Sequence, residues 1–257
     1  MTDRRSTPKA RKGRPPRSRA RLAIITVAAL LVAGAVGGGA YGIWYLFLQG
    51  PGPASVDQSR AAIPSGAAGG SLLTADGTWN IDPAIGSFSD FSDSYVGYRV
   101  QEQLASIGAN TAVGRTPNVT GSLTLLGTTL TAISVTADLT TLQSDDQRRD
   151  GQLRNQGIQT AQFPNATFSL TQPLDLHVLP APGATMTVTA TGDLTLHGVT
   201  KSVQIPVTVS LSGDVVEVTG SLPITFSDYG VTPPSSFAVL TVAGNGTMEF
   251  QLFFRHT

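Results

Sequence analysis

Apolar and polar residues alternate along most of the chain from Gly77 onward. In GDLTLHGVTKSVQIPVTVSL (residues 192–211), Leu194 and Leu196 share one face, and the alternation resumes after the HGVTK segment. Further runs with the same period occur in residues 131–142, 185–192, 222–226 and 248–254. Because successive side chains of a strand point to opposite faces, a period of two predicts β-strands with one apolar face.

Turn signals separate these runs. They are Gly127, His197-Gly198, Ser212-Gly213-Asp214 and Gly244-Asn245-Gly246. Sequential strands with one apolar face favour antiparallel pairing, with the other face in water. About eight such strands fit an all-β, antiparallel up-and-down barrel, with a two-sheet sandwich as the alternative. We expect this barrel domain to comprise residues 77–257.

One short helix is expected to interrupt the sheet. In the sequence SDDQ, Ser144 is followed three residues later by Gln147, which is the spacing of a capping box. Gly157 is placed to end the helix. We therefore predict a helix at about residues 145–156 that lies across the barrel as a lid or brace.

The inward-facing residues of the predicted strands are mostly of modest volume. An eight-stranded barrel can be filled by its own side chains, or it can hold one small ligand. The lining predicts an apolar tube, with a fully packed core as the alternative. The residues expected to line it are Ile133, Val135, Ala137, Val188, Ala190, Leu194, Val203, Ile205, Val207, Val209 and Phe250.

The N-terminal part of the chain has a different character. Leu22 to Leu48 contains no charged residue and is long enough for a transmembrane helix, which needs about 20 apolar residues. Nine of the 17 lysines and arginines lie within residues 1–21, so this basic tail is expected in the cytoplasm and the barrel outside. The alternatives are a cleaved signal peptide and lipid modification. Residues 49–76 are rich in Gly, Ala, Pro and Ser, which predicts a linker.

The remaining composition narrows the classes of function. A basic tail can bind nucleic acid, but its position directly before an apolar run favours a role in membrane topology, and we expect no nucleic-acid partner. The chain has no cysteine, which excludes disulfides and thiolate chemistry. After the basic tail, the rest of the chain contains eight basic and sixteen acidic residues.

Candidate chemistry is sparse. The three histidines, His177, His197 and His256, lack the spacing of metal ligands. DDQRRDG (residues 145–151) departs from a calcium loop, because Arg148 stands where an oxygen ligand belongs. No nucleophile motif or phosphate-binding loop occurs. We therefore predict no catalytic residue, no metal and no cofactor.

Five segments, in order, resemble the YceI-like family of bacterial envelope proteins. They are WNID (79–82), RDGQLR (149–154), FPNATF (163–168), GDLTLHGVTK (192–201) and DYGV (228–231). The resemblance covers about residues 77–255. It implies an extended, lipocalin-like antiparallel barrel whose core binds a long polyisoprenoid chain.

The chain departs from the family pattern at two places. The His-Ser pair that often follows the first strand is absent, and DSYVGY (93–98) stands there. Where many members have Arg-x-Asp-Phe-Gly, this chain has FSDYG (226–230). Polar contacts to a ligand's head group can therefore differ. At the mouth of the barrel, we take His197, Arg149 and Asp150 as candidates for such contacts.

The sequence thus predicts a membrane-tethered protein of the cell envelope. Its barrel is expected to hold a long isoprenoid or another apolar lipid. The alternatives are a structural or interaction module with a packed core and, less favoured, an envelope enzyme. The sequence leaves the oligomeric state open, a homodimer included.

Overall fold

A computed structural model describes residues 75–105, 108–234 and 239–256. The predicted membrane helix at residues 22–48, the basic tail and nearly all of the linker lie outside these residues. Among the described residues, no helix combines the length and apolar character needed to cross a membrane. The strands and helical segments follow one another as β1 (Gly77–Ile81), β2 (Tyr95–Leu104), β3 (Gly108–Thr116), β4 (Val119–Leu126), β5 (Thr129–Asp138), η1 (Leu139–Thr141), β6 (Gln143–Ser144), α2 (Gln147–Gln152), η2 (Leu153–Gly157), β7 (Asn165–Leu170), β8 (Leu174–Asp175), β9 (Thr185–Leu196), β10 (Val199–Ser212), β11 (Val215–Thr225), η3 (Phe226–Tyr229), β12 (Val239–Val242) and β13 (Asn245–His256).

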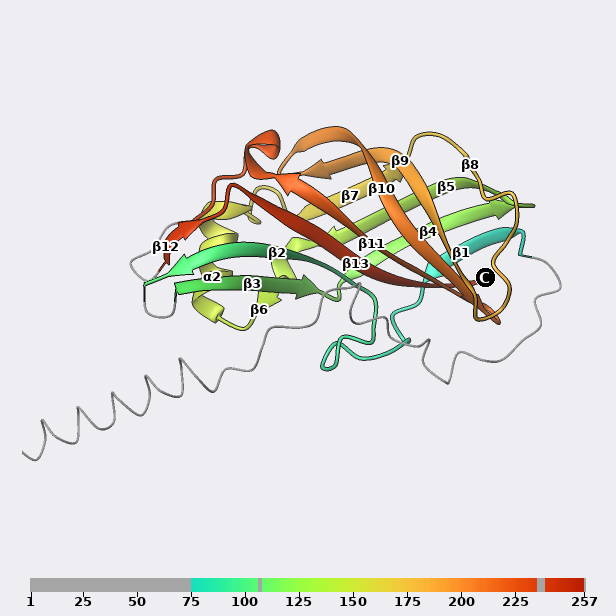
Figure 1. Cartoon of the computed structure of the whole chain (residues 1–257), viewed down its shortest axis with the longest axis horizontal. Coiled ribbons are helices and arrows are strands. Elements are labelled where there is room, and N and C mark those ends of the chain that lie inside the picture. Colours follow the sequence, from blue (N-terminus) through green and yellow to red (C-terminus); the bar gives the residue numbers. More distant parts are fainter. Residues whose placement is uncertain (1–74, 106–107, 235–238, 257) are drawn as a thin grey trace, which may run out of the picture. The chain divides into compact units, whose positions relative to one another are not determined.

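Eight antiparallel strands form a closed ring, which confirms the predicted barrel (Figure 1). The ring order is β1-β4-β5-β7-β9-β10-β11-β13, and these strands follow one another along the chain. Closure is made by β1 and β13, where Trp79 is paired with His256 and Ile81 with Phe254. A closed ring leaves no free edge, so every ring strand has two neighbours.

The sheet has an addition that the sequence pattern does not indicate. β2 pairs with the first half of β13, where Tyr95 lies opposite Gln251, while β1 pairs with the end of β13. β1 and β2 therefore follow one another along the same edge of β13. β3 and β6 extend the sheet beyond β2, and β12 pairs with the far end of β2. The barrel is thereby widened at one end.

The backbone conformations of His197 and Gly198 explain the predicted hairpin between β9 and β10. His197 and Gly198 form the two-residue turn between β9 and β10, with positive φ values of 52° and 75°. Two consecutive left-handed residues match a turn of type I′, which suits the twist of paired strands. The histidine is therefore a turn residue, as predicted. The turn sets a register in which Leu194 lies opposite Lys201 and Ala190 lies opposite Ile205.

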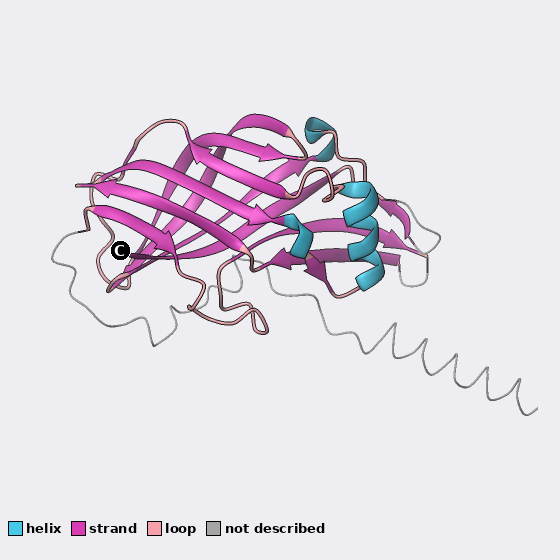
Figure 2. Ribbon diagram, turned by 180° about the vertical axis from the view of Figure 1, so that it is seen from behind, coloured by secondary structure: helices cyan, strands magenta, loops and turns pink. Residues whose placement is uncertain are grey.

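The helix forms close to its predicted position but with another cap. α2 continues directly into a π-helical turn, η2, that ends at Gly157. The residue at the N-cap is Asp146, whose side chain accepts a hydrogen bond from the Arg148 amide, so the prediction of Ser144 is wrong. Ser144 belongs to β6, and its amide and hydroxyl both donate to the Asp150 carboxylate, at 2.9 and 2.6 Å. Figure 2 shows this helical segment beside the end of the barrel that β2 and β3 widen.

The outer face of β13 is also buried, which differs from the wet outer face that alternation predicts. Residues 82–94 connect β1 to β2 and cover the outer face of β13. Ile85 of this segment packs on Val215 and Phe253, and the Phe253 amide donates to the Ser94 hydroxyl at 2.9 Å. Next to this contact, the Glu249 carboxylate pairs with Arg115 at 2.7 Å and with Arg99 at 2.9 Å. The Arg115 guanidinium also stacks over Tyr95 and Phe91, at 4.1 and 4.7 Å from the ring centres.

Replacement of Glu249 by alanine would leave Arg115 buried without the carboxylate that pairs with it. Removing one partner of a buried ion pair costs about 3–5 kcal/mol, so we expect a fall of that size in the free energy of unfolding. Urea unfolding followed by circular dichroism measures this change. Arg148→Ala, which breaks the exposed pair with Asp146, is the control, with an expected change below about 0.5 kcal/mol. A similar loss in both variants would contradict the role given to Glu249.

Asp93, in the covering segment, makes stability depend on pH. Burial raises the pKa of its carboxyl to about 6, from an ordinary value of 3.8, and the charge of Asp90 adds to this effect against that of Arg115. Its Oδ1 atom has no hydrogen-bond partner among the described residues. The folded protein therefore binds the proton more tightly than the unfolded chain does.

Because the folded pKa is the higher one, the contribution of Asp93 to stability is fully present below pH 3.8 and is lost as the pH rises through about 6. Asp93→Asn should therefore raise the free energy of unfolding at pH 7.5, by an amount on the order of 1–3 kcal/mol. It should also flatten the change in stability between pH 7.5 and pH 5. Urea unfolding of both proteins at the two pH values provides the test. A variant less stable than the parent at pH 7.5 would refute this account.

Candidate functional site

The barrel encloses a cavity that its own side chains do not fill. The cavity has a volume of about 130 Å³, roughly ten times the ~10–15 Å³ that holds one water molecule. Of its lining residues, only Thr167 and Met248 are neither aliphatic nor aromatic. An apolar space of this kind stays dry and favours apolar guests over water.

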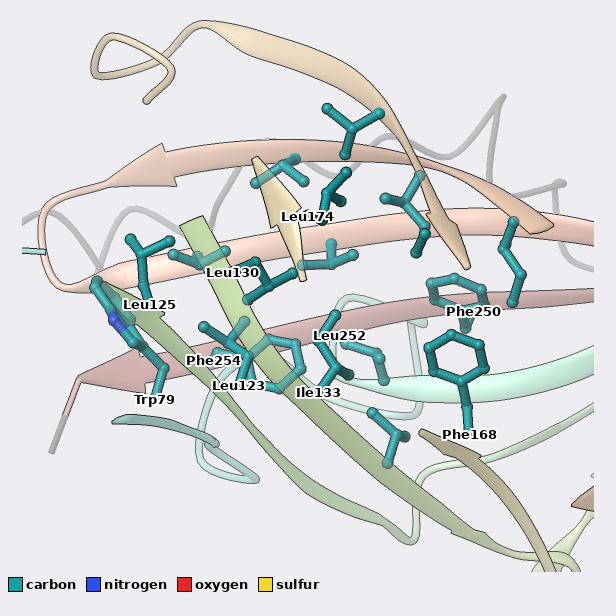
Figure 3. A pocket seen from close by; sticks show the side chains of 18 of the residues that line it. Trp79, Leu123, Leu125, Leu130, Ile133, Phe168, Leu174, Phe250, Leu252 and Phe254 are labelled. Carbon is teal, nitrogen blue, oxygen red and sulfur yellow. The ribbon is translucent and has the colours of Figure 1, made fainter. Parts of the chain in front are cut away.

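The sizes of the inward residues explain the shape of the cavity. Small side chains, including those of Ala137, Ala166 and Ala190, leave space inside the wall. Figure 3 shows Trp79 and Leu125 at one end of the cavity and the rings of Phe168 and Phe250 at the other, with Leu123, Ile133 and Leu252 between them.

Two glycines make room for the aromatic rings at that other end. A Cβ atom on Gly192 would lie 2.4 Å from the ring of Phe168, and one on Gly220 would lie 2.6 Å from the ring of Phe250. Each ring therefore lies directly over a glycine of the neighbouring strand. A larger residue at either position would push an aromatic ring into the cavity.

Most residues expected to line a tube do face this cavity. Ten of the eleven are among its lining residues, namely Ile133, Val135, Ala137, Val188, Ala190, Leu194, Ile205, Val207, Val209 and Phe250. Val203 is not among the lining residues; it is partly buried and packs against the main core and against the cluster of Leu194, Ile224 and Tyr229. Contact of the ten lining residues with a ligand stays a prediction.

Other lining residues were missed, and some of them carried a usable signal. Leu123 and Leu125 alternate on β4, Val216 and Val218 on β11, and Met248, Leu252 and Phe254 on β13. The run at residues 248–254 is predicted as a strand, and the same period-two analysis of β4 and β11 could have found the others. In contrast, Leu174, Leu176, Leu179 and Pro180 come from β8 and the loop after it, where no periodicity marks the inward residues.

A second cavity of about 140 Å³ lies at the widened end of the barrel. It shares Val96, Ala166 and Met248 with the first cavity, so the two spaces are neighbours along the barrel. Residues of β2, of β3 and of the segment from Leu139 to Ile158 line it. Sequence analysis did not indicate this cavity, because its walls come from elements that only the tertiary fold brings together.

The second cavity is apolar except for a few side chains, of which Glu102 and Arg149 carry charge. The Arg149 guanidinium donates to Glu102 at 2.7 Å, and it also pairs with Asp145. Burial opposes the charge of Arg149, but the hydrogen bonds and charges of Glu102 and Asp145 outweigh it and raise the pKa of the guanidinium. Burial also raises the pKa of the nearby Tyr98 hydroxyl, so this side chain stays neutral.

Two of the three polar candidates lie together, because the Arg149 guanidinium donates to the Ser144 hydroxyl at 3.3 Å and this hydroxyl donates to Asp150. Arg149 lines the second cavity, whereas Asp150 is buried in its hydrogen bonds with Ser144. His197 lines neither cavity: its Nδ1 atom lies 3.1 Å from the Tyr229 carbonyl, and its ring lies 4.2 Å from that of Phe163. Within the described part of the chain, no three His, Asp or Glu residues gather where they could hold a metal ion.

Comparison with known proteins agrees with this geometry. The sequence model of the YceI-like domain matches residues 79–254. A polyisoprenoid binding domain from Saccharophagus degradans, implicated in plant cell wall breakdown, is 20% identical, with a TM-score of 0.54 over 70% of this chain and 98% of that one. BcnA from Burkholderia cenocepacia is 22% identical, with a TM-score of 0.50 over 67% of this chain and 98% of that one. At these identities the likeness shows the fold. No curated protein matches the chain significantly.

Ala190 offers a direct test of the cavity, because its side chain is buried at the middle of the lining. Ala190→Trp would place a large ring in the empty space, so we expect the uptake of a fluorescent long-chain apolar probe to fall about tenfold or more. Thr189→Trp is the matched control, since Thr189 is exposed on the opposite face of the same strand. Probe titration measures the affinity, and circular dichroism checks the fold. Unchanged affinity in a folded Ala190→Trp variant would place the probe elsewhere.

Proposed function

The chain belongs to the YceI-like family, and from this premise we propose that it binds a long polyisoprenoid chain inside the barrel. The observation that carries the proposal is the unfilled cavity, with its almost wholly apolar lining. A packed core would have placed side chains in that space, so the cavity favours a binding protein over a purely structural module. We assign no catalytic role to any residue.

The class of ligand follows from the shape and chemistry of the cavities. The cavity between Trp79 and Phe250 is long, lined by branched aliphatic side chains, and continued by the second cavity through Val96 and Met248. A branched, flexible hydrocarbon fits such a lining better than a flat or polar molecule does. The structurally similar domain from Saccharophagus degradans is described as polyisoprenoid binding, which supports this choice.

Binding from solution works by transfer of hydrocarbon from water into the dry barrel. Burial of one CH₂ group contributes about 0.8 kcal/mol, so each five-carbon unit contributes roughly 3–4 kcal/mol before ordering costs. Association itself costs about 4–15 kcal/mol. Short isoprenoids therefore bind weakly, and affinity grows with chain length until the cavities are filled.

We further propose that the barrel works outside the cytoplasmic membrane and is tethered to it. The uncharged run from Leu22 to Leu48 provides the anchor, and the nine basic residues before it keep the N-terminus in the cytoplasm. The tether keeps the barrel close to the bilayer, which is the source of isoprenoid lipids. The protein thus holds a lipid that would otherwise stay in the membrane.

Organic extraction of the purified full chain followed by mass spectrometry tests the proposal, with a co-purified polyisoprenoid as the expected result. Titration with isoprenoids of increasing length should show affinity rising by about tenfold or more per added unit, until the chain exceeds the cavities. Ala190→Trp should remove both results, and Thr189→Trp neither. An extract without isoprenoid, together with no binding of long chains, would reject the proposal in favour of an interaction module.

A further inference from the structure

One end of the barrel is closed by an irregular segment where the wall lacks a strand. β7 ends at Leu170, which lies opposite Gly192, so the first part of β9 has no partner on β7. The residues of β5 before Ser134 likewise have no partner on β7. Residues 171–184, which we call the cap segment, occupy this wedge between β5 and β9 (Figure 1).

The cap segment is held by few backbone hydrogen bonds. Its short strand β8 forms two residue pairs with β5, and the Leu176 amide donates to the Thr128 carbonyl at 2.9 Å. Near its other end, the Gly183 amide donates to the Leu211 carbonyl at 3.1 Å. Its inner side chains, including Leu176 and Leu179, complete the lining of the first cavity. A segment with so few bonds opens at a lower cost than the strands beside it.

The outer side of this end is apolar. Among the described residues four large apolar side chains are exposed, and two of them lie here: Val178 on the cap segment, 67% exposed, and Leu126 at the β4–β5 turn, 65% exposed. The cap segment and the turn are joined, because the Thr128 hydroxyl donates to the Asp175 carboxylate at 3.1 Å. From Val178 to Ala184 the sequence contains no charged residue. Exposed apolar groups beside a cavity mark a contact surface.

The charges at this end favour an uncharged partner. Arg255 is paired with Asp82 and with Asp214, both at 2.6 Å. The His177 ring lies 3.0 Å from the Asp175 carboxylate. Arg255 is thus matched by two carboxylates, and this end of the barrel leaves little attraction for an anionic surface. An apolar, electrically neutral surface is the better complement.

The preceding part of the chain enters at the same end. The Gly127 amide, next to Leu126, donates to the Asp76 carboxylate at 2.5 Å. Between Leu48 and Ala75 there are 26 residues, which can reach at most roughly 90 Å. A membrane anchor at residues 22–48 would therefore hold this end of the barrel within reach of the bilayer. Such a tether raises the effective concentration of a weak apolar contact.

We propose that this end of the barrel docks on the lipid bilayer, with Leu126 and Val178 entering its apolar layer. The isoprenoid then passes between bilayer and cavity beneath the cap segment. The route of the isoprenoid rests on the proposed function, whereas the docking does not. Docking is driven by apolar burial, so it does not require anionic lipids.

The absence of cysteine from the chain allows a clean labelling test. Leu126→Cys and Val178→Cys are each labelled with a polarity-sensitive dye in the full chain, reconstituted in phosphatidylcholine vesicles. Leu240→Cys is the matched control, because Leu240 is 63% exposed on β12, which pairs with the far end of β2. We expect spin-labelled lipids to quench the dyes at positions 126 and 178 but not at 240, and added phosphatidylglycerol to leave this difference unchanged.

Equal quenching at all three positions would overturn the docking. So would a difference that appears only at high protein-to-lipid ratio, because that result would assign the surface to a second copy of the chain. Quenching at 126 and 178 in a protein that binds no isoprenoid would support docking and reject the proposed function. The two proposals can therefore fail separately.

The route is tested by the rate of isoprenoid transfer from the vesicles into the barrel. Val178→Asp places a charge at the apolar surface, so we expect transfer to slow about tenfold or more, with unchanged affinity for an isoprenoid supplied in detergent. Leu126→Asp should act in the same direction, and Leu240→Asp should leave the rate unchanged. Transfer by Val178→Asp at the parent rate would overturn the route beneath the cap segment.

Discussion

The burial of one apolar face inside a closed ring is the constraint on which the rest of the structure depends. The ring strands turn most of their aliphatic residues inward, and the pairing of β1 with β13 through Trp79 and His256 closes the ring. Closure fixes the diameter, because strand number and tilt set it together. Residues as small as Ala137, Ala166 and Ala190 cannot fill that diameter, and the cavity follows.

The polar interactions lie outside the first cavity. Glu249, Arg115 and Arg99 form a buried network on the outer face of β13, opposite the cavity. At the widened end, Arg149 is engaged by Glu102 and Asp145. This arrangement separates two tasks: charged pairs and the covering segment secure β13 from outside, while its inner residues Phe250, Leu252 and Phe254 remain apolar. Binding in such a barrel depends on volume and apolar surface.

The two ends of the barrel differ in how they are built. One is widened by β2 and β3 and braced by the helical segment, and the other is closed by the cap segment. Strands paired along their whole length resist opening, whereas a loop with few hydrogen bonds does not. A binding protein whose ligand is stored in a membrane needs both properties, a stable wall and a part that yields. The part that yields is the cap segment, which lies beside the exposed side chains of Leu126 and Val178.

The sequence by itself determined the features that depend on neighbouring residues. Alternation assigned the inner face of most strands, and His197-Gly198 marked a hairpin through backbone conformations that such residues adopt. The tertiary structure decided what depends on distant partners. Ser144 lost the cap position to Asp146 because β6 and Asp150 engage it, and Val203 turned out to pack beyond the cavity. No local pattern in the sequence marks the position of β2 along β13, the second cavity or the inward side of the cap segment. Contacts between residues far apart in the chain create all three.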